Sequence, residues 1–341
     1  MPLTSVVILN WNGKKLLEQF LPFVAEYSGN AEVIVADNAS TDDSIEFVLK
    51  NFPGIQIIKN DKNYGFAEGY NVALQWVKSK YIILLNSDVE VTPGWIDPLI
   101  SQMEADERIG AVQPKIKSWQ DKQMFEYAGA AGGFIDKWGY PFCRGRIFND
   151  LEEDLSQYNT STEVFWATGA CMAVRADVFL QAGGFDSDFF AHMEEIDLCW
   201  RIKNLGYKIY CSPDSIVYHV GGGTLNKYSP RKTYLNFRNN LMMMIKNLPK
   251  KKMFRTIFIR LLLDGIAAMK FLLAKNGFQH FVAVVKAHYY VYSNFNELKE
   301  KRYKLRDKNK YVNCIYKKSI VLEHFVFNKK KYSELDPNQF S

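Results

Sequence analysis

Oxygen-bearing side chains interrupt one apolar segment of the chain in a way that suggests a binding site. The stretch YIILLNSDVEV, Tyr81–Val91, runs through apolar residues into Asn86, Ser87 and Asp88, and then the apolar pattern resumes. An amide, a hydroxyl and a carboxylate offer hard oxygen atoms of the kind that Mg²⁺ and Mn²⁺ prefer. A polar turn at a strand end would give the same pattern, so this stretch alone leaves both interpretations open.

A cluster of acids offers a second kind of chemistry. Glu194, Glu195 and Asp197 lie within the stretch HMEEIDLCWRIKNLG. If a helix begins near Met193, all three carboxylates lie in its first turn, where the helix dipole favours their ionised forms. Acids so close together also repel one another, which raises the pKa of one of them toward the range that a general base needs. Ordinary stabilisation of a helix start is the competing interpretation.

Four apolar segments, several rich in β-branched residues, predict the strands that position these groups. They are Ser5–Asn10, Glu32–Asn38, Ile55–Asn60 and Tyr81–Asn86. Helical stretches at 41–52 and 66–79 lie between them, and the second places four side chains toward a core: Val72, Leu74, Trp76 and Val77. This alternation indicates parallel βαβ units, so we expect a wound, mostly parallel α/β sheet flanked by helices.

Each predicted strand ends in polar residues, at 10–12, 37–40, 60–61 and 86–88. Ligands of such sheets bind beyond the carboxyl ends of the strands, so four polar ends along one edge predict a site. The segment NWNG after the first strand has a single glycine, and the sequence contains neither GxGxxG after that strand nor GxxxxGK[ST]. Their absence disfavours a dinucleotide-binding enzyme and a P-loop.

Six stretches, taken in order, resemble the family-2 glycosyltransferases, which have the GT-A nucleotide-sugar-binding fold. They are VVILNWNG, VADNASTDDS, NYGFAEGYNVAL, YIILLNSDVEV, the segment from Trp166 to Tyr207, and VYHVGGGT, within residues 3–240. The closest resemblance is to bacterial rhamnosyltransferase-like members. It implies an inverting transfer of a sugar, with rhamnose among the candidates, from a UDP- or dTDP-linked donor. The implied acceptor is a glycan or a lipid-linked molecule in surface-polysaccharide synthesis.

The resemblance also implies a donor site with a metal ion. Nucleotide-sugar contacts fall on nine residues: Asn10, Asn12, Asp37, Asn38, Asn63, Gly65, Asn71, Asn86 and Ser87. Asp37 would accept a hydrogen bond from the imide N–H of uracil or thymine, with helix capping as the alternative. The family's Asp-x-Asp motif has Asn86 at its first position here, so the site lacks one carboxylate. Asp88 and His219 are the expected ligands of Mg²⁺ or Mn²⁺ on the donor diphosphate, and a structural role is the alternative for His219.

For the catalytic step, the resemblance assigns the general base to Glu195. The family commonly has aspartate at this position, and the longer side chain leaves Glu194 and Asp197 as rivals.

The other contacts implied by the resemblance lie around the acceptor and the diphosphate. The acceptor and sugar pocket is expected near Trp166, Gly169 and Trp200, with core packing as the competing interpretation of Trp166. Arg231 and Arg238 are the candidates for contacting the diphosphate, and a solvated helix face is the alternative for Arg238.

Charge divides the chain into an acidic body and a basic tail. Residues 241–341 contain 21 Lys plus Arg and 7 Asp plus Glu, a net charge of +14, whereas the whole chain carries +6, so the first 240 residues carry −8. We expect a GT-A catalytic domain at 1–240, with a nucleotide-sugar half at 1–117 and a catalytic half at 118–240. A helical, basic extension would follow at 241–341. Its interrupted apolar pattern predicts amphipathic helices for an anionic membrane surface, and a helical cap or a homodimer contact is the alternative.

Cysteine spacing and hydropathy bear on the compartment. Five cysteines stand far apart without a CxxC pair, which disfavours a zinc ribbon and a disulfide scaffold. The start of the sequence shows no basic leader, and no run of about 18 uncharged apolar residues follows, so we expect neither a secretion signal nor a spanning helix. These features predict a cytoplasmic protein, peripheral on the cytoplasmic face of the bacterial inner membrane. No nucleic-acid recognition module is present, so nucleic acid is not an expected partner.

Two rival functions are open at this point. A nucleotidyltransferase on a related fold would need a Gly-rich loop with Arg and Lys after the first strand, and NWNG does not provide one. A non-catalytic nucleotide-sugar-binding scaffold would explain Asn86 and Glu195, the two departures from the family pattern. We favour the enzyme.

Overall fold

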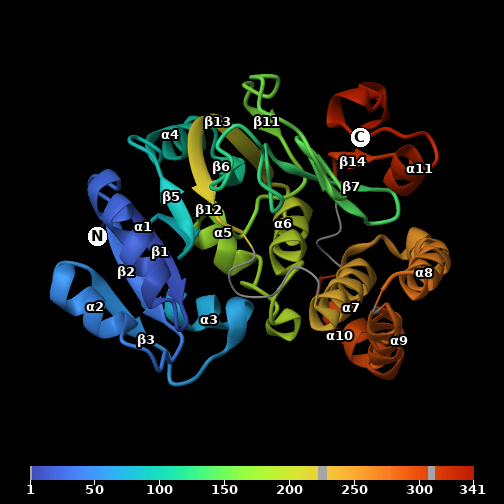
Figure 1. The fold of residues 1–341 in the computed structure, drawn as a ribbon, viewed down its shortest axis with the longest axis horizontal. Helices are drawn as coiled ribbons and strands as arrows, with labels where there is room; N and C mark the ends of the chain where they lie inside the picture. The colour runs from blue at the N-terminus through green and yellow to red at the C-terminus, as the bar shows by residue number, and fades with distance from the viewer. Residues whose placement is uncertain (1, 222–228, 276, 306–311) are drawn as a thin grey trace.

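The computed structural model describes residues 2–221, 229–275, 277–305 and 312–341. A mixed sheet of nine strands forms its centre, with eight strands in the order β11-β13-β6-β12-β4-β1-β2-β3 and β5 paired to β13 (Figure 1). The first four strands are β1 Thr4–Asn10, β2 Glu32–Asp37, β3 Gln56–Lys59 and β4 Tyr81–Asn86. All four are parallel to one another. The predicted α/β sheet is confirmed, and each predicted strand matches an observed one to within one residue at either end.

Helices cover both faces of this sheet because side chains along each strand alternate in direction. Ile83 and Leu85 of β4 pack with one group of helices and Ile82 and Leu84 with another. The first group is α1 Lys14–Tyr27, α2 Ser44–Asn51 and α4 Asp97–Ala105, and the second includes α3 Gly65–Leu74, α5 Ala176–Gln181 and α6 Glu194–Asn204. Helix α3 ends earlier than predicted, and the expectation that Trp76 faces a core is wrong, because its side chain is 68% exposed.

The second half of the chain extends the sheet beyond β4. Its strands are β5 Val89–Val91, β6 Ile109–Ser118, β11 Thr162–Glu163, β12 Cys171–Arg175 and β13 Lys208–His219. Strand β12 lies antiparallel between β4 and β6, and β13 runs parallel to β6. Because β13 also pairs with β5, His219 lies opposite Val89, next in sequence to Asp88.

A smaller sheet joins the middle of the chain to its last residues. Its order is β10-β9-β8-β7-β14, with bounds β7 Gly133–Asp136, β8 Pro141–Cys143, β9 Arg146–Ile147, β10 Asp150–Leu151 and β14 Ile315–Tyr316. Tyr316 is fully buried, and its ring lies 4.9 Å from that of Phe340 and 6.0 Å from that of Phe142. The last residues of the chain are therefore part of this core and do not form a detached extension.

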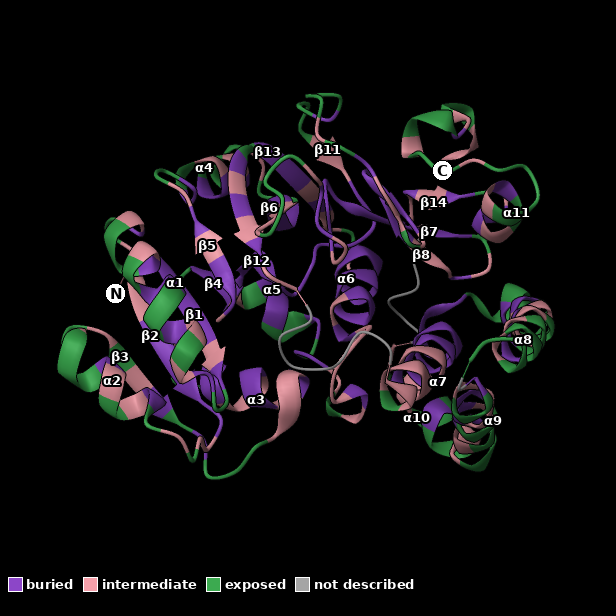
Figure 2. Cartoon of the chain, in the orientation of Figure 1, coloured by how far each residue is buried: buried purple, intermediate pink, exposed green. Residues whose placement is uncertain are grey.

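Four helices lead from the large sheet to this terminal segment, and a fifth follows β14. They are α7 Pro230–Asn247, α8 Lys250–Leu272, α9 Phe278–Ser293, α10 Phe295–Leu305 and α11 Ile320–Phe325. The boundary expected at 240/241 falls inside α7, whose residues 241–245 are buried, and the one at 117/118 falls inside β6 (Figure 2). Across the part of the chain that the structure describes, no helix has the length and apolar content to cross a membrane.

Candidate functional site

The carboxyl ends of β1, β2 and β4 meet at one edge of the sheet, as the polar strand ends predicted. Asn10 is paired in register with Asp37, and Leu9 with Asn86. The Asn10 amide nitrogen donates to Ser44 Oγ at 3.0 Å and to Asp37 Oδ1 at 3.3 Å. Its amide oxygen is buried without a partner. This edge is therefore a compact polar region backed by the core.

Several amides expected to contact the nucleotide sugar hold the loops of this edge together. Asn12 Oδ1 accepts from the Thr41 backbone N–H at 2.7 Å, and Asp37 Oδ2 accepts from that of Ser40 at 3.1 Å. Asn38 donates to Asn63 Oδ1 at 3.0 Å and to the Gly65 carbonyl at 2.9 Å. The Asp37 carboxylate thus closes the turn at Ser40, and it does not cap the following helix α2, whose N-cap residue is Asp43.

Asn71 and Gly65 connect the donor half to the loop that precedes α6. The Asn71 side chain accepts from the Phe185 N–H at 2.9 Å and donates to the Phe185 carbonyl at 2.8 Å. Gly65 has φ +74°, and a Cβ there would lie 2.6 Å from the ring of Phe190. The Phe190 carbonyl accepts from the Phe66 N–H at 2.9 Å. In this structure, the first turn of α3 faces Phe190, so the group that approaches Gly65 closely is a side chain of the protein itself.

The two expected metal ligands lie side by side. His219 Nε2 is 3.1 Å from Asp88 Oδ1, and both side chains are buried. Burial alone would lower the pKa of His219, but the carboxylates of Glu126 and Asp88 outweigh it and raise that pKa to about 10. Burial would raise the pKa of Asp88, and the charge of His219 outweighs it and lowers that pKa.

Glu126 is a member of this cluster that the sequence did not reveal. Its Oε2 lies 3.4 Å from His219 Nδ1, without hydrogen-bond geometry to that atom, and its side chain is buried. In the fold it lies against Gly221, where a Cβ would lie 2.7 Å from Glu126 Oε1, and no local pattern in the sequence links the two residues. Within the described ranges, no group of three or more His, Cys, Asp or Glu side chains is arranged to hold a metal ion. Asp88 and His219 would thus need further ligand atoms from a bound substrate.

A loop with unusual backbone angles carries the acids into place. Phe190, His192 and Met193 have φ of 61°, 72° and 71°, a region that side chains with a Cβ rarely adopt. Asn239 of α7 donates to the carbonyls of Phe189, Ala191 and His192 at 3.0, 2.9 and 2.7 Å. Helix α7 therefore holds the loop in the conformation that starts α6 at Glu194.

The three acids of α6 have different environments. Asp197 is fully buried, and it accepts from Arg201 Nε at 2.8 Å, Lys246 Nζ at 3.0 Å and Asn247 Nδ2 at 2.8 Å. Glu194 and Glu195 each have one carboxylate oxygen without a partner. Burial raises the pKa of Glu195 to about 7. Burial, and then the charges of Glu195 and Asp197, raise the pKa of Glu194 well above its usual range.

Glu195 is the more accessible of the two free acids, and it lies near the NSD segment. Its side chain is half-buried, whereas Glu194 is 5% exposed. A Cβ on Gly169 would lie 3.0 Å from the ring of Phe66 and 3.8 Å from Glu195 Cβ. The next residue, Ala170, accepts a hydrogen bond from the Asn86 N–H at 2.9 Å. Gly169, which was expected in the acceptor pocket, thus lies between Glu195 and Phe66 of the nucleotide-sugar half.

The tryptophans expected in the acceptor pocket are packed in the core. Trp166 is 3% exposed and donates from Nε1 to the Phe134 carbonyl at 3.0 Å. Trp200 is 2% exposed and meets Phe165 edge to face, with ring centres 5.3 Å apart. Core packing, the alternative left open for Trp166, is what this structure shows, and Trp200 is equally enclosed.

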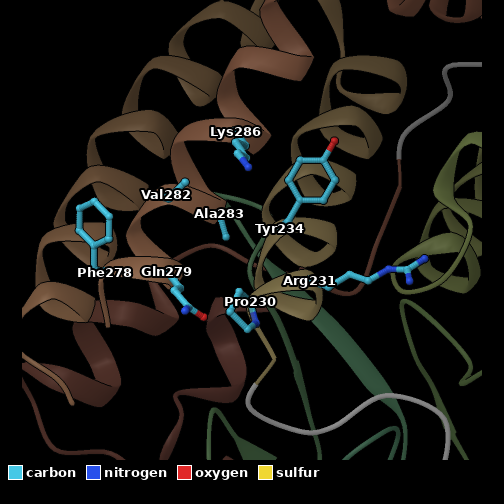
Figure 3. A pocket seen from close by; sticks show the side chains of 8 residues that line it. All are labelled: Pro230, Arg231, Tyr234, Phe278, Gln279, Val282, Ala283 and Lys286. Atoms are coloured by element: carbon cyan, nitrogen blue, oxygen red, sulfur yellow. The ribbon is translucent and has the colours of Figure 1, made fainter. Parts of the chain in front are cut away.

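The two candidate arginines occupy different surroundings. Arg238 is buried and donates to the Asp188 carbonyl at 2.7 Å, so it is not on a solvated face. The Arg231 guanidinium lies 5.2 Å from the centre of the Phe190 ring. Arg231 also lines a groove of about 480 Å³ between the starts of α7 and α9 (Figure 3). Its side chain extends away from the other labelled residues, toward the loop that precedes α6.

Comparison with known proteins places this geometry in context. The family model described as Glycosyl transferase family 2 matches residues 5–179, just over half of the chain. An N-acetylglucosaminyl-diphospho-decaprenol L-rhamnosyltransferase of Mycobacterium tuberculosis (strain CDC 1551 / Oshkosh) is 26% identical over 238 residues, 64% of this chain and 76% of that protein. Rhamnosyltransferase WbbL of Escherichia coli (strain K12) is 26% identical over 211 residues, 59% of this chain and 75% of that protein.

Two solved structures share the fold at low identity. The mannosyltransferase PcManGT from Pyrobaculum calidifontis, in complex with GDP-Man and Mn²⁺, aligns with TM-score 0.53 and 14% identity over 90% of this chain and 87% of that one. GalNAc-T7 with UDP, GalNAc and Mn²⁺ aligns with TM-score 0.53 and 18% identity over 71% of this chain and 47% of that one. The expected GT-A fold is confirmed.

Proposed function

Because the chain belongs to glycosyl transferase family 2, we propose that it is an inverting enzyme of bacterial surface-polysaccharide synthesis that transfers a sugar, with rhamnose the first candidate. The donor is a UDP- or dTDP-linked sugar, and the acceptor is a glycan or a lipid-linked molecule. Two similar proteins are named rhamnosyltransferases, and one of those names contains a decaprenol diphosphate. The observation that carries the proposal is Glu195, a half-buried acid with a free oxygen beside the polar edge of the sheet.

We propose that the donor binds across the ends of β1, β2 and β4. Asp37 and Asn10 lie opposite each other there, and the unpartnered Asn10 oxygen is a hydrogen-bond acceptor that a ligand could use. Phe190 of the loop before α6 lies against Gly65, so this loop borders the proposed donor site.

A divalent ion, Mg²⁺ or Mn²⁺, fits the donor set at Asp88 and His219. A carboxylate and an imidazole are both buried there, and the imidazole suits Mn²⁺ somewhat better than Mg²⁺. When bound, such an ion supplies positive charge to the leaving diphosphate. Glu126 lies 3.4 Å from the other ring nitrogen of His219, and in this proposal its charge, without a hydrogen bond to that atom, favours the orientation of the ring.

Glu195 is the general base in this proposal. It takes the proton of the acceptor hydroxyl, which attacks the anomeric carbon from the face opposite the diphosphate. A pKa of about 7 leaves a useful fraction ionised at neutral pH while keeping the group basic. Glu194 is less exposed, and the oxygens of Asp197 are occupied by cationic and amide donors. These contacts make Asp197 a support for the loop.

The test measures donor binding and turnover on the same set of proteins. Nucleotide sugars are screened with Mn²⁺ by thermal shift, and the stabilising donor is then assayed for transfer and hydrolysis. Glu195→Gln should keep the thermal shift and lose turnover, and Glu107→Gln, an exposed glutamate outside the site, should keep both. Donor binding without any turnover in the wild-type protein would favour the scaffold, and pyrophosphate release from a nucleoside triphosphate would favour the nucleotidyltransferase.

We also propose that the enzyme works at the cytoplasmic face of the inner membrane. The support is the basic excess of residues 241–341 together with the lipid-linked acceptor named for one relative. A homodimer remains the competing use of the tail.

A further inference from the structure

Helix α8 has three polar residues on its buried side and a row of large apolar residues on its exposed side. Thr256, Arg260 and Asp264 are 6%, 4% and 0% exposed. Arg260 Nε donates to Asp264 Oδ1 at 2.7 Å, and Arg260 Nη1 donates to Asn240 Oδ1 of α7 at 2.6 Å. The ion pair lies within the helix, and the inner face is attached to the body by the bond to Asn240 and by Tyr140, whose hydroxyl donates to Asp264 Oδ1 at 3.2 Å. A helix on a water-exposed surface normally has the opposite arrangement.

The outer face of α8 and the residue that follows it carry a row of large apolar side chains. Their exposed fractions are 68% for Phe254, 62% for Phe258, 56% for Leu262, 66% for Ile266, 60% for Met269 and 89% for Leu273. Successive members are three or four residues apart, so they share one side of the helix. We call these six residues the α8 face. Figure 2 shows exposed residues along this helix.

A second apolar element adjoins the α8 face. Phe325, Val326 and Phe327, which we call the α11 end, are 54%, 65% and 64% exposed. Lys270 of α8 lies 4.4 Å from the centre of the Phe325 ring, so the two elements are in contact. Helices α8 and α11 lie on the same side of the molecule in Figure 1. The exposed apolar surface therefore extends beyond one helix.

Positive charge surrounds this surface. Between Lys250 and Ser293 the one acid is Asp264, which is buried against Arg260. The other basic residues of this segment are exposed and take part in no salt bridge among the described residues: Lys250, Lys251, Lys252, Arg255, Lys270, Lys275 and Lys286. An apolar row flanked by lysines and arginines is the arrangement by which a helix lies in the interface of an anionic bilayer.

We propose that the α8 face and the α11 end form a bilayer-docking surface that inserts its apolar side chains among the lipids of an anionic membrane. This inference refines the membrane location in the proposed function, and it adds which residues enter the bilayer. A second copy of the chain is a poorer occupant, because a symmetric contact would bring the same basic residues of two subunits together. A bilayer with anionic lipids would bury the apolar row and attract the basic residues around it.

Docking through α8 would also orient the catalytic loop. Asn240 accepts from Arg260 of α8, and its neighbour Asn239 holds the three carbonyls ahead of α6. The docking surface itself contains none of the residues assigned to donor or acceptor chemistry.

The test measures vesicle binding of the full-length chain. Sedimentation is compared with vesicles of phosphatidylcholine containing phosphatidylglycerol and with vesicles of phosphatidylcholine alone. The variant Phe258→Gln/Leu262→Gln/Ile266→Gln removes three side chains from the α8 face and none from its inner face. The control Leu49→Gln/Trp76→Gln removes two side chains with similar exposure, 58% and 68%, from the opposite half of the chain. Circular dichroism and thermal melting confirm that both variants fold.

We expect the wild type and the control to bind the anionic vesicles, and the α8 variant to bind at least about tenfold more weakly at low salt. Equal binding by all three proteins would overturn the proposal, as would binding that salt abolishes and the substitutions leave unchanged. A wild-type dimer in solution that the α8 variant converts to monomer, with no vesicle binding by either, would assign the surface to a second copy. Donor hydrolysis in solution should be the same in all three proteins. No hydrolysis by the wild type would count against the proposed function and not against docking.

Discussion

Replacing Glu195 by glutamine tests the assignment of the base most directly. The substitution keeps the size of the side chain and removes its ability to accept a proton. Loss of a general base lowers rates by about 10²- to 10⁴-fold, so we expect kcat to fall by at least about 10²-fold, which is about 2.7 kcal/mol of barrier. Donor affinity should change little, because the neighbouring contacts of Gly169 and Phe66 do not involve this carboxylate.

The pH dependence adds a readout that a merely structural role would not move. Burial raises the pKa of Glu195 to about 7, so kcat/KM of the wild type should rise with pH up to about 7 and then level off. The raised pKa also makes the free energy of unfolding depend on pH. A carboxyl whose pKa is raised on folding binds protons more tightly in the native state, so its contribution to stability is lost as pH increases from the unfolded pKa toward 7.

The assay measures initial rates of sugar transfer against acceptor concentration at saturating donor and Mn²⁺, which gives kcat and kcat/KM for the acceptor across this pH range. It is run on the wild type, Glu195→Gln, Glu194→Gln and the control Glu107→Gln. Glu194→Gln should keep most of the activity and a single rise with pH, since burial still acts on Glu195. The reasoning is refuted if Glu195→Gln retains more than about a tenth of the rate, a barrier change under about 1.4 kcal/mol. A larger loss in Glu194→Gln would move the base to that residue.

Four further predictions follow from the contacts described above. Asp88→Asn should lose Mn²⁺-stimulated turnover by more than about tenfold while its thermal midpoint stays near that of the wild type; unchanged Mn²⁺ titrations would remove it from the metal site. Glu126→Gln should weaken Mn²⁺ affinity by about 10- to 100-fold with kcat restored at saturating metal, and a loss of kcat alone would contradict an orienting role. Asn239→Ala removes the amide that donates to three carbonyls of the loop, so it should lower both the thermal midpoint and kcat. Deleting residues 312–341 removes β14 and should give insoluble or unfolded protein, whereas a folded, active product would show that the small sheet is dispensable.

The first half of the fold was predictable because its signals are local. Strands β1, β2 and β4 are mostly apolar runs of six or seven residues, long enough to be read without their partners; β3 has four residues but stands in the alternation of strands and helices, and each of the four ends in a polar turn. The small sheet was not, since its strands are two to four residues long. Its stability comes from aromatic contacts such as that of Phe134 with Phe340, more than 200 residues away in sequence.

For the sheet edge, the sequence indicated which polar residues would gather there, but not the contacts that they make in the fold. The sequence indicated the amides of the sheet edge, but it could not show that Asn38 and Asn71 are already bonded to neighbouring loops. It indicated amphipathic helices in the tail, but periodicity does not say which side of a helix faces inward. In α8 the buried pair Arg260–Asp264 decides that question, and no local pattern distinguishes this pair from an exposed one at the same spacing.

The absence of an acid at Asn86 raises the question of whether this site can hold a divalent ion as firmly as an Asp-x-Asp motif. The structure shows which carboxylates lie near the proposed metal site. Asp88 and Glu126 lie on either side of His219, 3.1 and 3.4 Å from its two ring nitrogens, so two carboxylates still border the site. One of them comes from a segment after β6, outside the motif. We therefore infer that the negative charge missing at Asn86 is supplied through Glu126, acting on the metal through the histidine ring and not by direct contact.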